Sequence, residues 1–305
     1  FRHALIAEVL YDGMLPSQCR RLHRRIADML HAAPDAGPAS DRVAQLALHL
    51  DRAGDASGAF VALLAAADAS ESVAPAVALR QLERAFELWD DGGDGSDQER
   101  CERLWQAAEL ATGVVGNAHA VGLAREALRW GVPARGAAWA HERLGRYLWA
   151  SGEIDASHAE FAAVAALVET EPSAEGTASA IAGLAQAALM SGDVTAAERW
   201  CRTVLERVPR VADDPAAWVM AMRVLGAARA DAADLAPARE HARAALAAAP
   251  TPYARAMAAA YLGIVLLEAG DYQEAVDVAI DGGGDARLAG LDRSFGAYFD
   301  SVAAD

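Results

Sequence analysis

The stretch Tyr261–Ala279, YLGIVLLEAGDYQEAVDVA, has the pattern of two helices joined by a tight turn. Leu262 is followed by a glycine, and this pair lets a second helix approach the first closely. Gly270 can adopt the left-handed conformation that ends a helix. Asp271 follows it, where a carboxylate can cap the second helix and oppose its dipole. Ala275 then provides a small contact across the turn, so the stretch predicts a helical hairpin.

The same pattern occurs three more times upstream, in Arg143–Phe161, Gly183–Cys201 and Val224–Ala242, with steps of 40, 41 and 37 residues. Each copy has a leucine beside a small residue, then a turn residue, an acid and another small residue. The turn residue is glycine in two of these copies and Ala233 in the third. A hairpin cannot bury its apolar face alone, so stacking of successive hairpins has to supply the core. The sequence therefore predicts an all-α solenoid of helical hairpins, right-handed, from about Val43 onward.

Prolines mark the limits of helices between these copies. Pro209 and Pro250 are placed to close second helices. The pairs Asp214-Pro215 and Thr251-Pro252 follow, each with a capping residue before a proline at the first helical turn. We expect both pairs to begin the next first helix.

Weaker copies lie upstream, in His49–Phe60 and Ala111–Ala124, and Pro75–Trp89 has apolar residues at helical spacing. Ser96–Glu99 has the pattern of a capping box. The intervening Asp90–Asp97, DDGGDGSD, is the clearest linker.

The glycine-rich stretch Ile280–Ala286, IDGGGDA, follows a predicted helix rather than a strand. We expect a loop that stops the helix and not a phosphate-binding loop.

Charge argues against nucleic acid as a direct partner. The chain has no lysine, and 27 arginines face 43 acids, for a net charge of −16. Beyond the first 31 residues the balance is 22 arginines to 40 acids, which repels phosphate backbones. Cys19, Cys101 and Cys201 are about a hundred residues apart, which favours neither a zinc site nor a disulfide framework and fits a reducing, cytoplasmic setting.

Four arginines cluster near the start of the chain, within CRRLHRRIADML. The interpretation from the residues is an amphipathic helix, with Leu22, Ile26, Met29 and Leu30 as its packed stripe and the arginines on a solvated face. Contact with nucleic acid is the alternative, but no aromatic residue interleaves with the arginines.

The sequence contains no complete motif of a catalytic or cofactor site. A P-loop needs a lysine, which the chain lacks, so nucleotide binding by this chain is not expected. The acids of Asp90–Asp97 lack the glutamate of a calcium loop, and His141-Glu142 lacks the second histidine of a zinc hydrolase. We expect a non-enzyme with no cofactor and no metal.

The four copies resemble tetratricopeptide repeats from Arg135 to about Ile280, although their steps exceed the usual 34 residues of that family. In that family the first helix of each pair lines a concave groove. The resemblance therefore implies a site for a small molecule or a peptide made of groove-facing residues. These are Trp139, Glu142, Arg146, Trp149, Gln186, Leu189, Met190, Met220, Arg223, Met257 and Ile264. Apolar residues suit an adaptable pocket and the two arginines suit a carboxylate or phosphate, while packing between helices is the competing interpretation.

The opening Phe1–Leu30 resembles the end of the nucleotide-binding module in large ATP-binding bacterial regulators of the LuxR type. The resemblance lies in Phe1-x-His3-x-Leu5-Ile6, then Glu8 and Tyr11, and later Arg21-Leu22-His23 with Ile26-Ala27. It implies a remnant of a winged-helix and ATPase module at 1–41, a repeat domain at 42–305 that is cut short at its end, and a DNA-binding helix-turn-helix elsewhere in the same polypeptide.

Three functions follow as hypotheses. The first is the sensor domain of a multidomain transcription regulator, relaying an effector or protein signal to ATPase and helix-turn-helix domains. The second is a pure protein-interaction scaffold, and the third is the regulatory body of a nucleotide cyclase or protein kinase. Homo-oligomers are left open, and no membrane association is expected because no apolar run approaches the ~18 residues of a membrane span.

Overall fold

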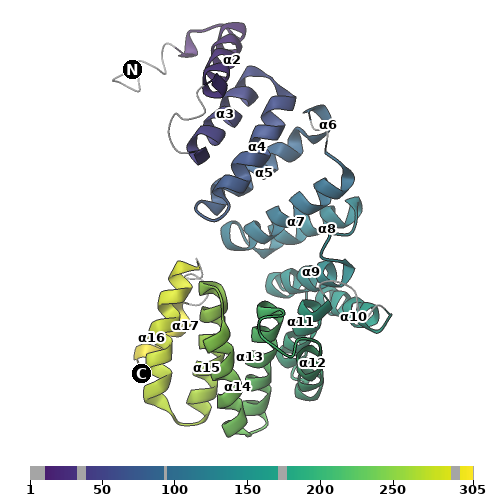
Figure 1. Cartoon of the computed structure of the whole chain (residues 1–305), viewed down its shortest axis with the longest axis vertical. Helices are drawn as coiled ribbons and strands as arrows, with labels where there is room; N and C mark the ends of the chain where they lie inside the picture. The colour runs from purple at the N-terminus through teal and green to yellow at the C-terminus, as the bar shows by residue number, and fades with distance from the viewer. Residues whose placement is uncertain (1–10, 33–38, 93–94, 171–176, 290–295, 305) are drawn as a thin grey trace. The chain divides into compact units, whose positions relative to one another are not determined.

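The protein is built of α-helices. The computed structural model describes residues 11–32, 39–92, 95–170, 177–289 and 296–304, and within these ranges it has 16 helices and no strand (Figure 1). The chain divides into two compact units, Phe1–Gly131 and Val132–Asp305, and each is described by itself below. The predicted all-α, helical-hairpin solenoid is confirmed.

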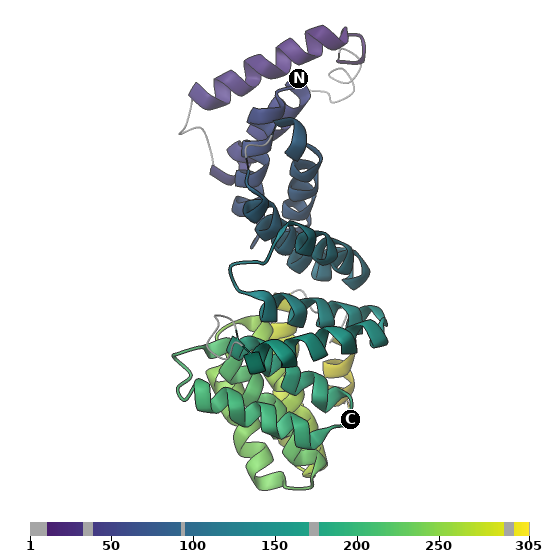
Figure 2. The same cartoon turned by 90° about the vertical axis from the view of Figure 1, so that its right-hand side faces the viewer.

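The first unit contains an N-terminal helix followed by antiparallel pairs. Its helices are α2 (Pro16–Ala32), α3 (Ala39–Ala53), α4 (Ala56–Ser70), α5 (Pro75–Glu87), α6 (Trp89–Gly92), α7 (Asp97–Val114) and α8 (Asn117–Trp130). Helices α3 and α4 form one hairpin and α7 and α8 another, while α5 packs against both α4 and α7. Figure 2 shows α2, in purple, along one end of this unit, where it packs on α3.

The predicted boundary at 41/42 is not where the contacts divide the chain. Helix α2 packs on α3 across that position, and the compact units meet at Gly131 and Val132. The predicted boundary separates a remnant of an ATPase module from a repeat domain and does not depend on how the helices pack, so it stays a prediction. Residues 1–10, which carry part of the resemblance to LuxR-type regulators, lie outside the described residues.

The second unit is a stack of four hairpins. Its helices are α9 (Ala137–Ser151), α10 (Ile154–Thr170), α11 (Thr177–Met190), α12 (Val194–Arg207), α13 (Pro215–Asp231), α14 (Leu235–Ala248), α15 (Pro252–Glu268), α16 (Tyr272–Leu288) and α17 (Ala297–Ala304). The first helices α9, α11, α13 and α15 each pack on the next, and each is backed by the second helix of its own pair. The first helices therefore form one continuous layer.

The hairpin turns have the conformation that the repeats predict. Gly152, Gly192 and Gly270 have φ angles of 87°, 81° and 77°, and Ala233 takes the same left-handed conformation at φ 60°. Glycine adopts this conformation without steric cost, whereas Ala233 does so at a penalty.

The acids after these turns play two different roles. The Asp193 carboxylate accepts a hydrogen bond from the Ala196 N–H at 2.9 Å, as a capping residue should. Asp234 and Asp271 make no side-chain cap. They accept hydrogen bonds from Arg229 and Arg239 instead, so the predicted capping is wrong for these two acids.

The proline-marked starts are confirmed. Asp214 accepts from the Ala217 N–H at 3.0 Å, and Thr251 accepts from the Ala254 N–H at 3.1 Å, each with proline in the first turn.

Small residues pack at the contact between the two helices of each hairpin, as predicted. Ser157, Ala197, Ala238 and Ala275, at the predicted contact position, are fully buried. A Cβ added at Gly226 would stand 3.1 Å from the Ala238 carbonyl oxygen.

Two expectations about the helices are wrong. The stretch Ile280–Ala286 lies inside α16 instead of forming a loop. Glycine is required there for packing, because a Cβ on Gly282 would meet Phe299 Cε1 at 2.6 Å and the Ala259 Cβ at 2.8 Å. Contacts with Phe299 on α17 and Ala259 on α15 thus explain Gly282 better than a turn does.

The packed stripe of α2 also differs from the prediction. His23 and Ala27 are its buried residues, while Leu22 is 39% and Met29 is 70% exposed. Ile26 and Leu30 are partly buried beside them. The sequence pattern placed the stripe on the larger side chains, but the close approach of α3 selects the alanine side of the helix.

Candidate functional site

Polar side chains from all four first helices of the second unit come together on one face of their layer. We call this set the arginine–tyrosine cluster. It consists of Glu142 and Arg146 on α9, Gln186 on α11, Arg223 on α13, and Tyr253 and Tyr261 on α15.

The α9 members form the charged end of the cluster. Glu142 and Arg146 are one helical turn apart, and Arg146 Nη1 lies 3.5 Å from Glu142 Oε1. Glu142 is only 3% exposed, and its carbons occupy the space over Gly183, where an added Cβ would stand 2.3 Å from Glu142 Cγ. Gly183 on α11 therefore makes room for a buried carboxylate.

Arg223 is the most unusual member. It is 4% exposed, and its Nη2 donates to Gln186 Oε1 at 2.5 Å. Its guanidinium carbon stands 5.0 Å from the centre of the Tyr261 ring, in cation–π geometry. Its Nε has no hydrogen-bond acceptor in the described part of the chain, and no carboxylate there lies within 4.0 Å of it. A neutral amide and an aromatic face thus hold a buried cation.

The electrostatics of the cluster follow from these contacts. Burial lowers the pKa of Arg223 below its ordinary value. Tyr261, Tyr253 and Glu142 act in the opposite direction, and the charge of Arg146 acts with burial. Burial alone would lower the pKa of Arg146 too, but the Glu142 carboxylate and a hydrogen bond with Tyr253 raise it. Burial would raise the pKa of Tyr253, yet the neighbouring arginines lower it. Two guanidinium groups therefore share one carboxylate within the cluster, and an anion would compensate the second guanidinium group.

Beside this cluster the same layer exposes apolar side chains. Met190 on α11 is 46% exposed, and Ile264 and Leu267 on α15 are 44% and 38% exposed. Tyr253 is 46% exposed. The layer therefore offers apolar surface next to donors for an anion.

The structure separates the predicted groove residues into two groups. Glu142, Arg146, Gln186 and Arg223 meet in the arginine–tyrosine cluster, and Met190 and Ile264 are exposed on the same layer. The remaining five are Trp139, Trp149, Leu189, Met220 and Met257.

These five pack mainly within the unit. Trp139 and Met257 are 5% and 8% exposed, and Leu189 and Met220 lie partly buried against the core. The Trp149 ring lies 5.9 Å from that of His158 on the second helix of its own hairpin. For Trp139 and Met257, packing between helices is the better interpretation. Whether any of the eleven residues binds a ligand stays a prediction.

Sequence reasoning missed Tyr253 and Tyr261. The resemblance to tetratricopeptide repeats implies groove-facing positions five and two residues before, and two, five and six residues after, the repeated leucine. Neither tyrosine occupies one of these positions. Tyr261 directly precedes Leu262, where the other copies have Arg143, Gly183 and Val224. Because all four copies differ at this position, the repeat pattern gives no signal for Tyr261.

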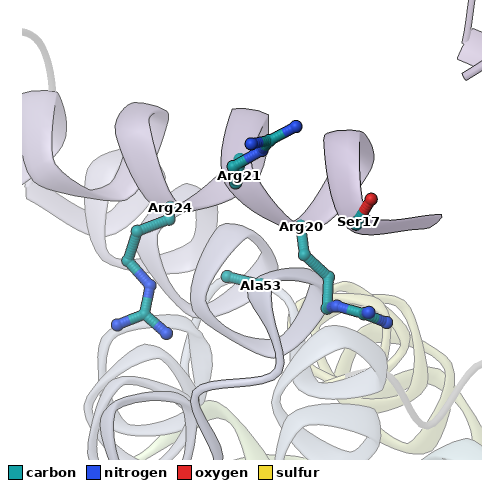
Figure 3. Close-up of a pocket in the computed structure, with 5 residues that line it drawn as sticks. All are labelled: Ser17, Arg20, Arg21, Arg24 and Ala53. Atoms are coloured by element: carbon teal, nitrogen blue, oxygen red, sulfur yellow. The ribbon is translucent and has the colours of Figure 1, made fainter. Parts of the chain in front are cut away.

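The arginines of α2 line a separate hollow in the first unit. It measures about 340 Å³ and is bounded by Ser17, Arg20, Arg21, Arg24 and Ala53. Figure 3 shows Arg20 and Arg24 directed to either side of Ala53, with Arg21 turned away from it. Arg24 donates to Asp55 at 3.1 Å. The three arginine side chains are exposed, as the interpretation of a solvated face predicts.

Other kinds of site have little support in the described ranges. They contain no group of three or more histidine, cysteine or acidic residues placed to hold a metal ion. None of their helices combines the length and apolar character that crossing a membrane requires. All three cysteines are unpaired.

Comparisons with known proteins give a limited result. No family model matches the chain, and no curated protein matches it. Among solved structures, the TPR2AB-domain:pHSP90-complex of yeast Sti1 aligns over 92% of this chain and 98% of that one. The two chains are 13% identical, and the TM-score is 0.35.

Proposed function

We propose that this chain is a non-catalytic interaction domain, and that the first-helix layer of Val132–Asp305 is its recognition surface. The observation that carries the proposal is Arg223, a buried cation with no carboxylate partner among the described residues. An unpaired buried charge is costly, so such a residue is retained more readily where a bound group compensates it.

The partner that fits is a protein segment with an anionic group beside apolar side chains. Arg146 and Arg223 would hold the carboxylate or phosphate, since guanidinium groups suit planar or tetrahedral anions. Met190, Ile264 and Leu267 would contact the apolar part, and the thioether of methionine adapts to different shapes. A layer of four first helices offers an extended surface, which suits a peptide better than a compact effector.

An anion titration tests the arginine pair directly. The side-chain Nε–H signals of Arg146 and Arg223 would be followed by NMR while sodium acetate or sodium phosphate is added at constant ionic strength. We expect both signals to shift with saturation, because an anion contacts these guanidinium groups. Arg239, which pairs with Asp271, is the matched control and should not shift.

The variants Arg223→Met and Arg146→Met complete this test. Each should abolish saturation at the remaining arginine while the thermal midpoint of Arg146→Met stays close to that of the unaltered chain. Equal, non-saturating shifts at all arginines, including Arg239, would contradict the proposal, because they would report non-specific contact of the anion with every guanidinium group.

The wider context is a further proposal that rests on the sequence resemblance. In it, this domain belongs to a cytoplasmic, bacterial transcription regulator of the LuxR type, with ATPase and helix-turn-helix domains in the same polypeptide. The three unpaired cysteines support a reducing compartment. The full-length coding sequence tests it: a P-loop upstream and a helix-turn-helix downstream are expected, and a cyclase or kinase domain in their place would contradict it.

A further inference from the structure

We infer that a pair of facing histidines makes the docking of α2 on α3 sensitive to pH, so that α2 is released when the solution becomes mildly acidic. The inference concerns the first unit alone and is independent of the proposed recognition surface.

The pair joins the two helices directly. His23 Nδ1 on α2 lies 2.8 Å from His49 Nδ1 on α3, and the two rings are 5.0 Å apart at an angle of 31°. On its other side His23 Nε2 lies 2.9 Å from the Tyr11 hydroxyl. His23 is 4% exposed. A hydrogen bond between the two Nδ1 atoms requires one of them to be unprotonated, so the docked arrangement cannot hold two imidazolium ions.

The distance also distinguishes this pair from a metal site. Two ring nitrogens bound to one zinc ion at about 2.0–2.1 Å in tetrahedral geometry stand roughly 3.3 Å apart. The observed 2.8 Å is the length of a hydrogen bond. The histidines therefore bind each other and leave no space for an ion between them.

The charged groups around the pair would not offset a second proton. Arg52 on α3 acts on both rings and is itself a cation. The nearby carboxylates are engaged elsewhere: Asp51 pairs with Arg84 on α5, and Asp55 at the start of α4 accepts from Arg24. Two imidazolium ions would thus face each other beside an arginine.

Few large apolar side chains of α2 are fully buried. Ala27 is its fully buried apolar residue, Ile26 and Leu30 are partly buried, and Leu22 and Met29 are exposed. The apolar contribution of α2 to docking is therefore smaller than that of a fully packed helix. The remaining Arg24–Asp55 ion pair is partly exposed and contributes little.

The direction of the effect follows from proton linkage. Burial lowers the pKa of both histidines below the ordinary 6.5, with their neighbours adding to it. A histidine whose pKa is lower in the docked state stabilises docking fully above pH 6.5, and this contribution is lost as the pH falls. Each unit of lowering in one histidine corresponds to about a tenfold change in the docking equilibrium.

Hydrogen–deuterium exchange of the full chain tests the inference. After correction for the intrinsic rate at each pH, protection of the α2 amides should fall by about tenfold or more between pH 7.5 and pH 5.5. The amides of α13 should keep their protection over this range. Unchanged protection of α2 at pH 5.5 would overturn the inference.

Variants assign the cause. His49→Gln and His23→Gln should each reduce the pH dependence of α2 protection, because each variant removes one of the two facing rings. His119→Gln on α8, which removes a partly exposed histidine bonded to Glu83, should behave like the unaltered chain. If α2 loses as much protection between pH 7.5 and pH 5.5 in both the His23 and the His49 variant as it does in the unaltered chain, the inference is overturned.

If α2 fails to pack on α3 in both variants, a measurement on the unaltered chain still tests the inference. The imidazole NMR signals of His23 and His49 should titrate below pH 6.5, over the same interval in which α2 loses protection. Titration of both rings without loss of α2 protection would overturn the inference.

Discussion

Helix α16 contains three consecutive glycines, and replacing two of them separately should change stability in opposite directions. Gly284 has no heavy atom within 4 Å of an added Cβ, whereas Gly282 would meet Phe299 at 2.6 Å and Ala259 at 2.8 Å. Both positions lie inside the helix, so both replacements gain the same helix propensity. The difference between them isolates the packing.

The magnitudes come from these distances. Gly284→Ala should raise the free energy of unfolding by about 0.5–1 kcal/mol, the gain of alanine over glycine within a helix. Gly282→Ala makes the same gain but overpacks the contact with α17, at a cost of about 1–3 kcal/mol. We expect a net loss of about 1 kcal/mol, or a fall of about 2–4 °C in the midpoint of a unit of this size.

Urea denaturation followed by circular dichroism measures both variants. Measured against Phe299→Ala alone, adding Gly282→Ala should cost less than it does in the unaltered chain, since the clash with the ring is removed while the contact with Ala259 stays. If Gly284→Ala destabilises the chain, or if both variants shift equally, the glycines are not inside a packed helix and the reasoning is refuted.

Three further outcomes are expected. Ala233→Gly should stabilise the third hairpin by about 1 kcal/mol in thermal unfolding, because glycine takes the left-handed conformation at φ 60° without penalty; a loss of stability would show that the turn differs. Burial raises the pKa of Cys101 to about 11 and of Cys201 to about 12, so a thiol reagent at pH 8 should label Cys19 first and the other two only on unfolding, as mass spectrometry would show. Burial would raise the pKa of Asp68, but hydrogen bonds from α7 lower it overall. The Asp68 carboxylate therefore contributes to the free energy of unfolding above its ordinary pKa of 3.8, and this contribution is lost as the pH falls below that value. Asp68→Asn should reduce the loss of stability on acidification below pH 3.8, and an unchanged dependence of stability on acid pH would contradict this.

The sequence predicted the hairpins well because their signals are local. Gly152, Gly192 and Gly270 end helices through their own backbone conformation, and Asp214 and Thr251 cap helices within three residues. Such features depend on neighbours in the chain, which a sequence displays directly.

Other features depend on residues that are distant in sequence. Gly282 is fixed by Phe299 on another helix, so a glycine run that looks like a loop is helical. The packed side of α2 is selected by α3, and the pairing of His23 with His49 spans 26 residues. No periodic pattern reports these contacts.

The candidate site was predicted in part for the same reason. The resemblance to tetratricopeptide repeats implied that Arg146, Gln186 and Arg223 face one groove. It could not show that Arg223 is buried over Tyr261 with only an amide partner among the described residues, or that Trp139 packs inward.

Binding of peptides to the arginine–tyrosine cluster is the measurement that tests the central claim most directly. A random peptide display library with free carboxyl termini would be selected on the unaltered chain, and the enriched peptides titrated by calorimetry. We expect enriched peptides to share an acidic or terminal carboxylate beside apolar residues. Their affinity should fall at least about tenfold in Arg223→Met and Arg146→Met, which corresponds to loss of one charge-assisted contact, and stay unchanged in the control Arg243→Met. Peptides that bind all three variants equally, or a selection that enriches none, would contradict the account.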